Sequence, residues 1–411
     1  MKVGIIGAGI SGLSVAQMLK KHFEVEILEK DNKIGGLAKT KTINGVTYHL
    51  VGGHCFNSKN ANVLNFVFTN ILPESEWHLV ERKAKIFFKG HLIDYPIEFS
   101  VKQIACFDED LAFNITKDFF AIKDNKSPEN LADWFVQKFG KTLAEEYFIP
   151  YSRKIWGQDP YRMDYVWVKD KLPIPDKKSF FLSLVKKVSD NMPHSYFFYP
   201  NSNNQQTFIN ALAKDLKIEK NYKVESIEKI GNKYVINGEK KYDIVINTMP
   251  LNILPFVIKE TPIEVRNKSK LLKYNKITNV LWESEPVENT WTYFPEREIK
   301  FHRHIHIGNF FEPKNSRYTI TEVIGEHSYE DMLNYAKKLD FLIKPLSYNV
   351  SEHAYVIFDK NYKNAKSYIL EFVEYYGIYT LGRFGEWEYY NMDICIEKAM
   401  KLSKKIVERY R

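Results

Sequence analysis

The hydrophobic pattern at the start of the chain predicts a strand, a helix and a second strand in immediate succession. Residues 2–6 (KVGII) form a short apolar run of the strand type, and residues 25–28 (VEIL) form another. Between them, apolar residues recur at helical spacing from Leu13 to Leu19. This order of elements is typical of an α/β protein with a parallel sheet.

A helical block interrupts this α/β pattern in the first half of the chain. Apolar residues follow three- and four-residue spacing in 101–107, 110–121 and 128–139. Ser127, which precedes a proline, fits the N-cap of the third helix, and Gly140 fits its end. We therefore predict an inserted helical domain.

Strand patterns flank the helical block on both sides. Residues 84–97 predict a β-hairpin around Gly90, and residues 276–282, 291–295 and 318–323 predict a second sheet region. The end of the chain then returns to a strand followed by a long helix.

The loop after the first strand carries a glycine motif in the context that dinucleotide binding requires. Gly7 permits a tight turn, Gly9 lets a pyrophosphate approach the backbone, and Gly12 lets the helix pack closely on the strand. The start of the helix offers unpaired N–H groups to phosphates. Glu29 follows the second strand, where a carboxylate binds a ribose and disfavours the 2′-phosphate of NADP. We assign cofactor binding in this region to Gly7, Gly9, Ile10, Ser11, Gly12, Glu29 and Lys30.

A second glycine pair distinguishes between cofactors. Gly35 and Gly36, followed by Leu37, resemble the FAD-binding extension of the amine oxidase, protoporphyrinogen oxidase and UDP-galactopyranose mutase group. The end of the chain resembles the closing FAD motif of the same group, with Gly-Arg, a later Tyr and then Met-Asp at a helix start. The resemblance implies FAD as the cofactor, bound with the help of Gly36, Leu37, Val224, Gly382, Arg383, Tyr389, Asn391, Met392 and Asp393.

Three internal segments resemble the UDP-galactopyranose mutase family in particular. Gly53 and His54 fall on the family's loop that lies against the flavin, and Arg303 falls on an arginine before an aromatic-x-Pro turn. Tyr151 and Trp156 match a Tyr and a Trp of the nucleotide-sugar site. The resemblance covers essentially the whole chain, and the chain is identified as a diverged member of this family.

The resemblance implies an α/β fold with three structural units. These are a discontinuous Rossmann-type FAD-binding domain, an inserted helical domain that carries substrate and lid residues, and an antiparallel β-sheet domain. The expected boundaries are 1–97, 191–262 and 351–411 for the three parts of the FAD-binding domain, 98–190 for the helical domain and 263–350 for the sheet domain.

The resemblance also implies a chemistry and a set of residues for it. The family exchanges the pyranose and furanose forms of a nucleotide-linked sugar without net oxidation, with the reduced flavin as the nucleophile toward the sugar. We expect His54 and Arg303 to be catalytic, and we expect the substrate to be bound by Tyr151, Trp156, Lys171, Arg303, Tyr355 and Tyr389. The sugar would serve surface polysaccharide synthesis, and a homodimer is left open.

The mobile lid of the family departs from its usual pattern in this chain. The family has arginines around a Leu-Pro pair, and those places hold Lys171 and Pro175 here. Two alternatives to a mutase therefore stay open: an FAD-dependent oxidoreductase of the amine oxidase or protoporphyrinogen oxidase type, and a flavoprotein that binds without catalysis. An oxidase of hydrophobic amines has no need of a diphosphate-binding cluster.

Three histidines alternate along one predicted strand. His302, His304 and His306 would lie on one face, as metal ligands can. No carboxylate or cysteine completes the set, so we predict no metal.

Composition and charge exclude several classes of protein. The chain has 411 residues, of which 44% are hydrophobic and 27% charged, which is typical of a globular protein with two or three domains. No apolar run reaches about 18 residues, so we expect no membrane insertion. The fold pattern begins at Met1, which leaves no room for a signal peptide. Three scattered cysteines indicate a reducing compartment, and we expect a cytoplasmic protein.

The net charge of +8 arises from 59 basic and 51 acidic residues. The lysines are spread along the chain, whereas a nucleic-acid-binding protein usually shows a basic stripe or a known module. We therefore expect no nucleic-acid partner. The excess of basic residues is consistent with a solvated lysine-rich surface and also with a basic cleft that binds a diphosphate.

Overall fold

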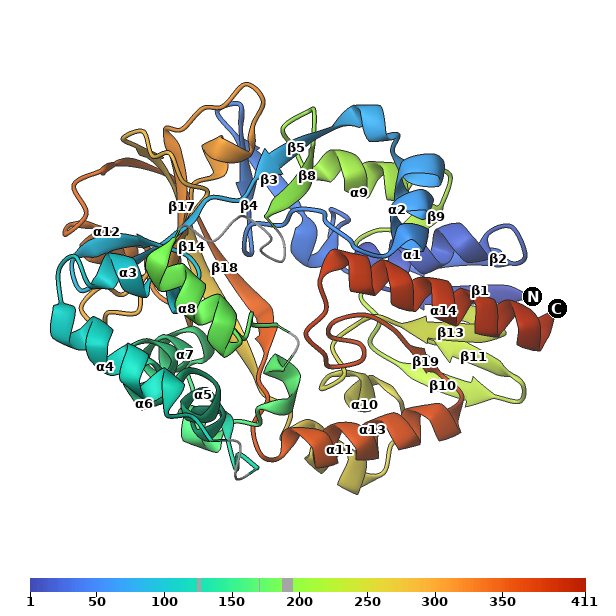
Figure 1. Ribbon diagram of the computed structural model, residues 1–411. Helices are drawn as coiled ribbons and strands as arrows, with labels where there is room; N and C mark the ends of the chain where they lie inside the picture. Colours follow the sequence, from blue (N-terminus) through green and yellow to red (C-terminus); the bar gives the residue numbers. More distant parts are fainter. Residues whose placement is uncertain (124–126, 170, 187–194) are drawn as a thin grey trace.

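The molecule is built around two β-sheets that lie in separate halves (Figure 1). The computed structural model describes residues 1–123, 127–169, 171–186 and 195–411. One half holds a five-stranded sheet between helices, and the other holds a seven-stranded sheet with a group of helices beside it. Both chain ends lie in the first half. The predicted boundary between 98–190 and 191–262 falls outside the described residues.

The five-stranded sheet is parallel and has the order β19-β13-β1-β2-β9. This confirms the predicted Rossmann-type arrangement and the α/β class. The strands are β1 (Lys2–Ile6), β2 (Glu24–Leu28), β9 (Lys217–Glu219), β13 (Ile244–Asn247) and β19 (Tyr379–Thr380).

Helices cover both faces of this sheet. Ile5 packs into the core on one face and Ile6 into the core on the other, because successive strand residues point in opposite directions. The first core is shared with α1 (Ile10–Leu19), α9 (Gln206–Leu212) and α14 (Met392–Tyr410). The second is shared with α10 (Leu254–Val257), α11 (Ile263–Ser269) and α13 (Tyr362–Tyr376).

The seven-stranded sheet has the order β18-β14-β17-β16-β15-β6-β7. Its strands are antiparallel except for the β15–β6 pair, which is parallel, so the sheet is mixed and not purely antiparallel as predicted. They are β6 (Ala84–Phe88), β7 (His91–Asp94), β14 (Tyr274–Ser284), β15 (Trp291–Tyr293), β16 (Arg303–Ile305), β17 (Tyr318–Ile324) and β18 (Leu342–Val356).

Three expected domain boundaries differ from the observed strand pairing and helix packing. The hairpin β6–β7 forms as predicted, but it extends the seven-stranded sheet, although the boundary 1–97 grouped it with the FAD-binding domain. Strand β18 runs through the boundary at 350/351, and helix α11 packs in the Rossmann half rather than with 263–350. Local alternation predicts a strand, but it does not say which sheet the strand joins.

The helical block packs beside the seven-stranded sheet (Figure 1). Its helix α5 begins at Leu131 and not at Pro128, because the side chain of Asn130 accepts a hydrogen bond from the Asp133 amide at 2.9 Å and caps the helix there. Gly140 ends the helix as predicted, with φ of 84°. The α-helices are α3 (Val101–Ile104), α4 (Glu109–Phe120), α5 (Leu131–Phe139), α6 (Lys141–Leu143), α7 (Ile149–Trp156) and α8 (Lys177–Val185).

Smaller elements connect the two halves and cover their edges. They are β3 (Thr40–Ile43), β4 (Val46–His49), β5 (Trp77–Glu81), β8 (Tyr196–Pro200), β10 (Ile227–Ile230), β11 (Lys233–Ile236), β12 (Lys240–Tyr242), α2 (Ala61–Asn65) and α12 (Tyr329–Ala336). No described helix is long and apolar enough to cross a membrane.

A buried carboxylate on β2 joins the Rossmann sheet to its neighbours. The Glu26 side chain is 1% exposed and lies 3.0 Å from the Lys2 ammonium and 3.1 Å from that of Lys240. The Tyr242 hydroxyl donates to it at 2.8 Å. Burial raises the pKa of Glu26, but the hydrogen bonds from Lys2, Tyr242 and Lys240 outweigh burial and lower the pKa from 4.5 to about 2.

We expect the Glu26→Gln variant to be less stable than the wild type at neutral pH, and we expect this difference to shrink in acid. A carboxyl whose pKa is lowered by folding stabilises the protein above pH 4.5 and loses that contribution as the pH falls toward 2. The free energy of unfolding, measured with urea, should fall by roughly 2 kcal/mol at pH 7. The deficit should shrink steadily below pH 4.5. Glu24→Gln, at a largely exposed side chain, is the control, and a pH-independent deficit would contradict the assignment.

Candidate functional site

A cavity of about 1360 Å³ lies between the two sheets. It is larger than a typical pocket for a single small ligand, which spans roughly 300–1,000 Å³. Its walls include the loop after β1, the loop after β2, the segment after β4, helix α7 and the segment between β19 and α14. A cofactor and a substrate can therefore lie in it together.

The cavity gathers nearly all of the residues that the sequence singled out. Gly12 and Tyr355 are the exceptions, since neither lines the wall. The predicted residues on the wall are Gly7, Gly9, Ile10, Ser11, Glu29, Lys30, Gly36, Leu37, Gly53, His54, Tyr151, Trp156, Lys171, Val224, Arg303, Gly382, Arg383, Tyr389, Asn391, Met392 and Asp393. The structure thus brings together residues from both ends of the chain.

The glycines of the first motif lie where only small residues fit. Gly7 has φ of 101°, and a Cβ on Gly12 would come within 2.1 Å of the Gly7 carbonyl oxygen. Gly382, with φ of 92°, lies so close to α1 that a Cβ would stand 2.4 Å from the Ser11 hydroxyl oxygen. The two FAD-like motifs, from opposite ends of the chain, therefore pack against each other.

Glu29 is buried and held in place at the end of β2. Its carboxylate accepts hydrogen bonds from the Ala8 amide at 2.7 Å and from the Asp31 amide at 2.9 Å. Two backbone donors fix its orientation while lone pairs remain for a ribose. Gly36 approaches Gly9 closely, since a Cβ on it would lie 3.1 Å from the Gly9 Cα.

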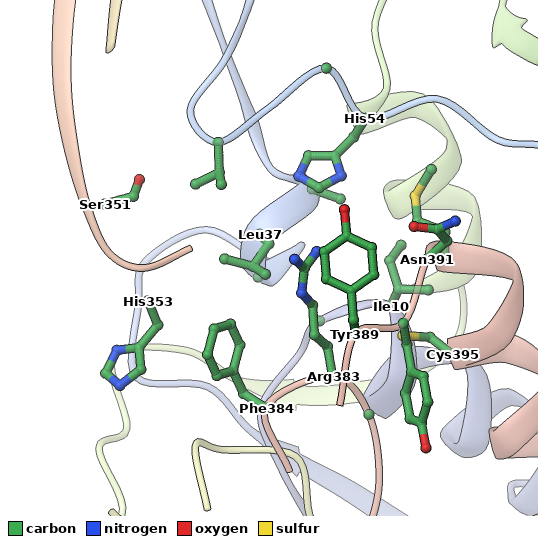
Figure 2. A pocket seen from close by; sticks show the side chains of 18 of the residues that line it. Ile10, Leu37, His54, Ser351, His353, Arg383, Phe384, Tyr389, Asn391 and Cys395 are labelled. Carbon is green, nitrogen blue, oxygen red and sulfur yellow. The ribbon is translucent and has the colours of Figure 1, made fainter. Parts of the chain in front are cut away.

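Arg383 and Tyr389 lie side by side at the centre of the cavity, with His54 beyond the tyrosine hydroxyl (Figure 2). The guanidinium of Arg383 lies 4.5 Å from the centre of the Tyr389 ring and 4.8 Å from that of Tyr355. Its Nε and Nη2 atoms are buried and have no hydrogen-bond partner among the residues that the structure describes. Buried donors of this kind require an acceptor, which a ligand can supply.

His54 presents an unpartnered nitrogen. Its Nε2 is buried without a hydrogen-bond partner, and its backbone amide donates to Nδ1 of His49 at 3.3 Å. Burial, together with the nearby His49 and the cations Arg383 and Arg303, lowers the pKa of His54 to about 3. The ring is therefore neutral at physiological pH.

Arg303 is held by a buried carboxylate on the neighbouring strand. The side chain of Glu322 on β17 accepts a hydrogen bond from the Arg303 Nε and another from the Gly52 amide at 2.7 Å. Arg303 Nη2 donates to the Tyr355 hydroxyl at 2.8 Å. Tyr355 thus acts on the cavity through Arg303, and its ring stacks on that of Tyr389 at 6.0 Å.

Helix α7 and the segment after it form an aromatic wall. Trp156 meets Trp167 edge-on at 4.7 Å, and its ring centre lies 5.7 Å from that of Tyr355. Lys171 places its ammonium 5.5 Å from the centre of the Tyr389 ring. An aromatic wall beside a group of cations suits a ligand with a flat ring and a phosphate.

Part of the cavity wall carries no sequence motif. Arg82, Glu98, Tyr293 and Trp167 line it, although no motif pointed to them. A signal was present, since Glu98 stands in an otherwise apolar segment, PIEF, where a charged residue is unexpected. Burial raises the pKa of Glu98 to about 8.

The histidine triplet lies in a packed region of the seven-stranded sheet. His302, His304 and His306 are all buried, and His304 packs 4.4 Å from the ring of Phe294. His306 has ordinary partners, the hydroxyls of Thr292 and Thr319, each at 2.9 Å. Within the described ranges, no group of three His, Cys, Asp or Glu side chains could hold a metal.

The residues present fit a dinucleotide cofactor. Glycines open a cradle that Cβ atoms would fill, a helix N-terminus faces it, and a fixed carboxylate stands at the ribose position. The buried Nε and Nη2 donors of Arg383, which have no partner among the described residues, mark the place of acceptor atoms, and the Nε2 of His54 marks a further polar contact.

Comparison with known proteins gives matches of two kinds. Residues 5–68 match the family model described as "NAD(P)-binding Rossmann-like domain". Among curated proteins, the chain is 29% identical to a UDP-galactopyranose mutase from Mycoplasma genitalium over 43% of this chain and 45% of the relative. It is 26% identical to a dTDP-fucopyranose mutase from Escherichia coli over 42% and 46%, respectively. The matched region thus spans less than half of each relative.

Solved structures share the fold over nearly the whole chain. A reduced UDP-galactopyranose mutase superimposes with a TM-score of 0.85 at 20% identity, over 99% of this chain and 94% of the other. A protein described as a putative protoporphyrinogen oxidase from Exiguobacterium superimposes with a TM-score of 0.75 at 16% identity, over 99% of both chains.

We expect the His54 ring to stay neutral between pH 5 and pH 8, because its pKa is lowered to about 3. The measurement is a pH titration of the histidine ring signals by NMR, with the His54→Gln variant used to assign the signal. A midpoint near the ordinary value of 6.5 would show that the ring is not buried among cations as described.

We expect the Glu322→Gln variant to be strongly destabilised, because it leaves the Arg303 charge buried without its carboxylate. The loss in free energy of unfolding should be about 3 kcal/mol by urea denaturation. Glu326→Gln is the matched control, since that carboxylate is exposed and pairs with Lys276 at the surface. Equal losses in the two variants would contradict a special role for Glu322.

Proposed function

We propose that this chain, a diverged member of the UDP-galactopyranose mutase family, is a flavin-dependent mutase that interconverts the pyranose and furanose forms of a nucleotide-linked sugar. The proposal rests on one observation: a single cavity holds both the dinucleotide cradle and a group of cationic and phenolic side chains. These side chains are Arg303, Tyr389, Arg383 and Lys171. Cations and phenols at the cradle suit a second diphosphate, that of the substrate.

FAD is the cofactor that the proposal requires, and it would be held by the cradle already described. The ADP portion would lie against Gly7, Gly9 and Glu29, and the flavin would reach the loop that contains Gly53 and His54. When bound and reduced, the flavin supplies a nucleophile for the anomeric carbon of the sugar.

The protein's own contribution is to hold the substrate in place. Arg303 has its Nε committed to Glu322 and one Nη2 donor to Tyr355, so its orientation is set before any ligand binds. A preorganised guanidinium stabilises the diphosphate as its bond to the sugar breaks, and it keeps the diphosphate near for its return. His54, neutral with a free Nε2, would accept or pass a proton beside the flavin.

The aromatic wall would receive the nucleoside and exclude water. Tyr151 and Trp156 on α7 offer flat faces to a base or a sugar ring. Lys171 follows in the segment that matches the family's lid, where it would pair with a phosphate as a point charge rather than as an arginine fork. Pro175 stands where the family has its second lid arginine. The remaining cationic contacts to the substrate diphosphate would therefore come from Arg303 and Arg383.

The oxidoreductase alternative is supported by the likeness of fold to the putative protoporphyrinogen oxidase. Fold alone does not determine chemistry. The cationic cluster favours the mutase, because an apolar substrate makes no use of the Arg303 guanidinium and the Lys171 ammonium on the cavity wall. A place in surface polysaccharide synthesis in the cytoplasm, with a nucleotide sugar as the partner, belongs to the same proposal.

We expect the anaerobic holoprotein to convert a nucleotide sugar into an isomer of unchanged mass, and only after reduction by dithionite. UDP-galactose and dTDP-fucose are the first substrates to test, with products separated by chromatography and FAD measured after extraction. Absence of any isomer, together with flavin bleaching by a reducing substrate without dithionite, would favour the oxidoreductase.

We expect Arg303→Lys to lower kcat/KM about 100-fold, because a lysine does not reproduce the fixed fork of the guanidinium. The control is Lys169→Ala, which removes an exposed lysine beside Tyr165 near the same lid and should leave kcat/KM unchanged. If the two variants behave alike, Arg303 does not bind the diphosphate.

A further inference from the structure

Arg82 is a cation inside the cavity with few partners of its own. It follows β5, and its Nη2 donates to the Tyr293 hydroxyl at 2.9 Å. This is the one hydrogen bond that its side chain makes to the described residues, although a guanidinium carries five N–H groups. The Nε atom is buried without a partner. The group lies 5.6 Å from the Tyr95 ring centre and 5.1 Å from that of Trp291.

Within the described part of the chain, the charge of Arg82 is not balanced by a carboxylate. Among the residues that the structure describes, no Asp or Glu side chain forms an ion pair with Arg82, whereas Arg303 is paired with Glu322. Glu98 lines the same cavity, but burial raises its pKa to about 8, so it is largely uncharged at pH 7. A buried, unbalanced guanidinium that faces a cavity is a site for an anion.

This anion site is separate from the proposed diphosphate site. Arg303 lies on β16, and Arg82 precedes β6, which is two strands further along the sheet with β15 between them. Strands lie about 4.8 Å apart, so this spacing is roughly 10 Å. The guanidinium of Arg303 also turns the other way, toward Glu322 on β17 and Tyr355 on β18. The two arginines therefore reach the cavity from opposite sides of β15.

The position of Arg82 places this anion at the sugar end of the substrate. Trp291, against which Arg82 packs, touches the loop proposed to lie on the flavin, since a Cβ on Gly53 would be 3.2 Å from its ring. The sugar has to reach the flavin for the proposed reaction. Nucleobases carry no negative charge at neutral pH, so a second anion on such a substrate belongs to the sugar.

We propose that Arg82 binds a carboxylate on the sugar, so that the substrate is a nucleotide-linked uronic acid. This inference rests on the proposed function and narrows its substrate class. A carboxylate can accept two parallel hydrogen bonds from the free edge of the guanidinium. The carboxyl group at C6 hangs from C5 and takes no part in the exchange of ring size, so no bond to it forms or breaks and no redox partner is needed.

The test compares two ligands that differ only at C6, UDP-galacturonic acid and UDP-galactose. Binding to the oxidised holoprotein is measured by calorimetry, and isomer formation is measured separately after reduction. We expect the uronate to bind roughly 10- to 100-fold more tightly than the neutral sugar. Arg82→Gln should remove that preference, while Arg82→Lys should retain part of it.

Lys83→Gln is the matched control, because it removes one positive charge from the adjacent residue, whose exposed ammonium pairs with Glu81 at the surface. It should keep the full preference. The FAD content of each variant reports whether it folds. A loss of folding in Arg82→Gln leaves Arg82→Lys and the wild-type preference as the decisive measurements.

The outcomes separate this inference from the proposed function. Isomerisation of UDP-galactose without any preference for the uronate would overturn the inference and leave the mutase standing. An Arg82-dependent preference for the uronate without isomer formation would support the inference about the site and count against the mutase. Failure of both ligands to bind would overturn both.

Discussion

The carboxylate of Glu322 is the point at which the seven-stranded sheet is tied to the loop beneath the cavity. It accepts hydrogen bonds from the Arg303 guanidinium and from the Gly52 amide. Arg303 belongs to the sheet, and Gly52 belongs to the loop that follows β4. A buried ion pair adds little net stability, but loss of one partner leaves an uncompensated charge. The main effect of the Arg303–Glu322 pair is therefore to fix the position of the Arg303 side chain relative to the loop that contains Gly52.

The distribution of paired and unpaired cations follows from this arrangement. Arg303 is neutralised within the protein and pointed by its partners. Arg383 and Arg82 rest on aromatic rings and keep buried donors without acceptors. Aromatic faces stabilise a cation without consuming its hydrogen bonds. The cavity is thus prepared for anions at more than one place, while an apolar ligand would leave these donors unsatisfied.

Local sequence patterns predicted which segments form strands and helices better than they predicted which strands pair with each other. The first strand, the glycine loop and the helix after it formed as expected, because apolar periodicity and glycine spacing act over a few residues. The β6–β7 hairpin also formed, but it joined the sheet of the other half through a parallel pair with β15. That pairing links residues about two hundred positions apart, and alternation within a hairpin carries no information about it. The start of α5 was misplaced because Asn130, and not Ser127, meets a free amide of the first turn.

The sequence by itself indicated the dinucleotide cradle, and nearly all of the site residues that it singled out lie on the cavity wall, because they belong to short motifs whose chemistry is local. It also indicated that both ends of the chain would serve one cofactor, and in the structure Gly382 lies close to Ser11. Only the tertiary structure decided that Arg303 has a carboxylate partner and that Arg82 has none among the described residues. The sequence does not distinguish the two arginines in this respect, because whether a guanidinium meets a carboxylate depends on which strands the sheet places next to each other. Burial makes this difference important, because an unpaired charge is costly inside a protein and mild at its surface.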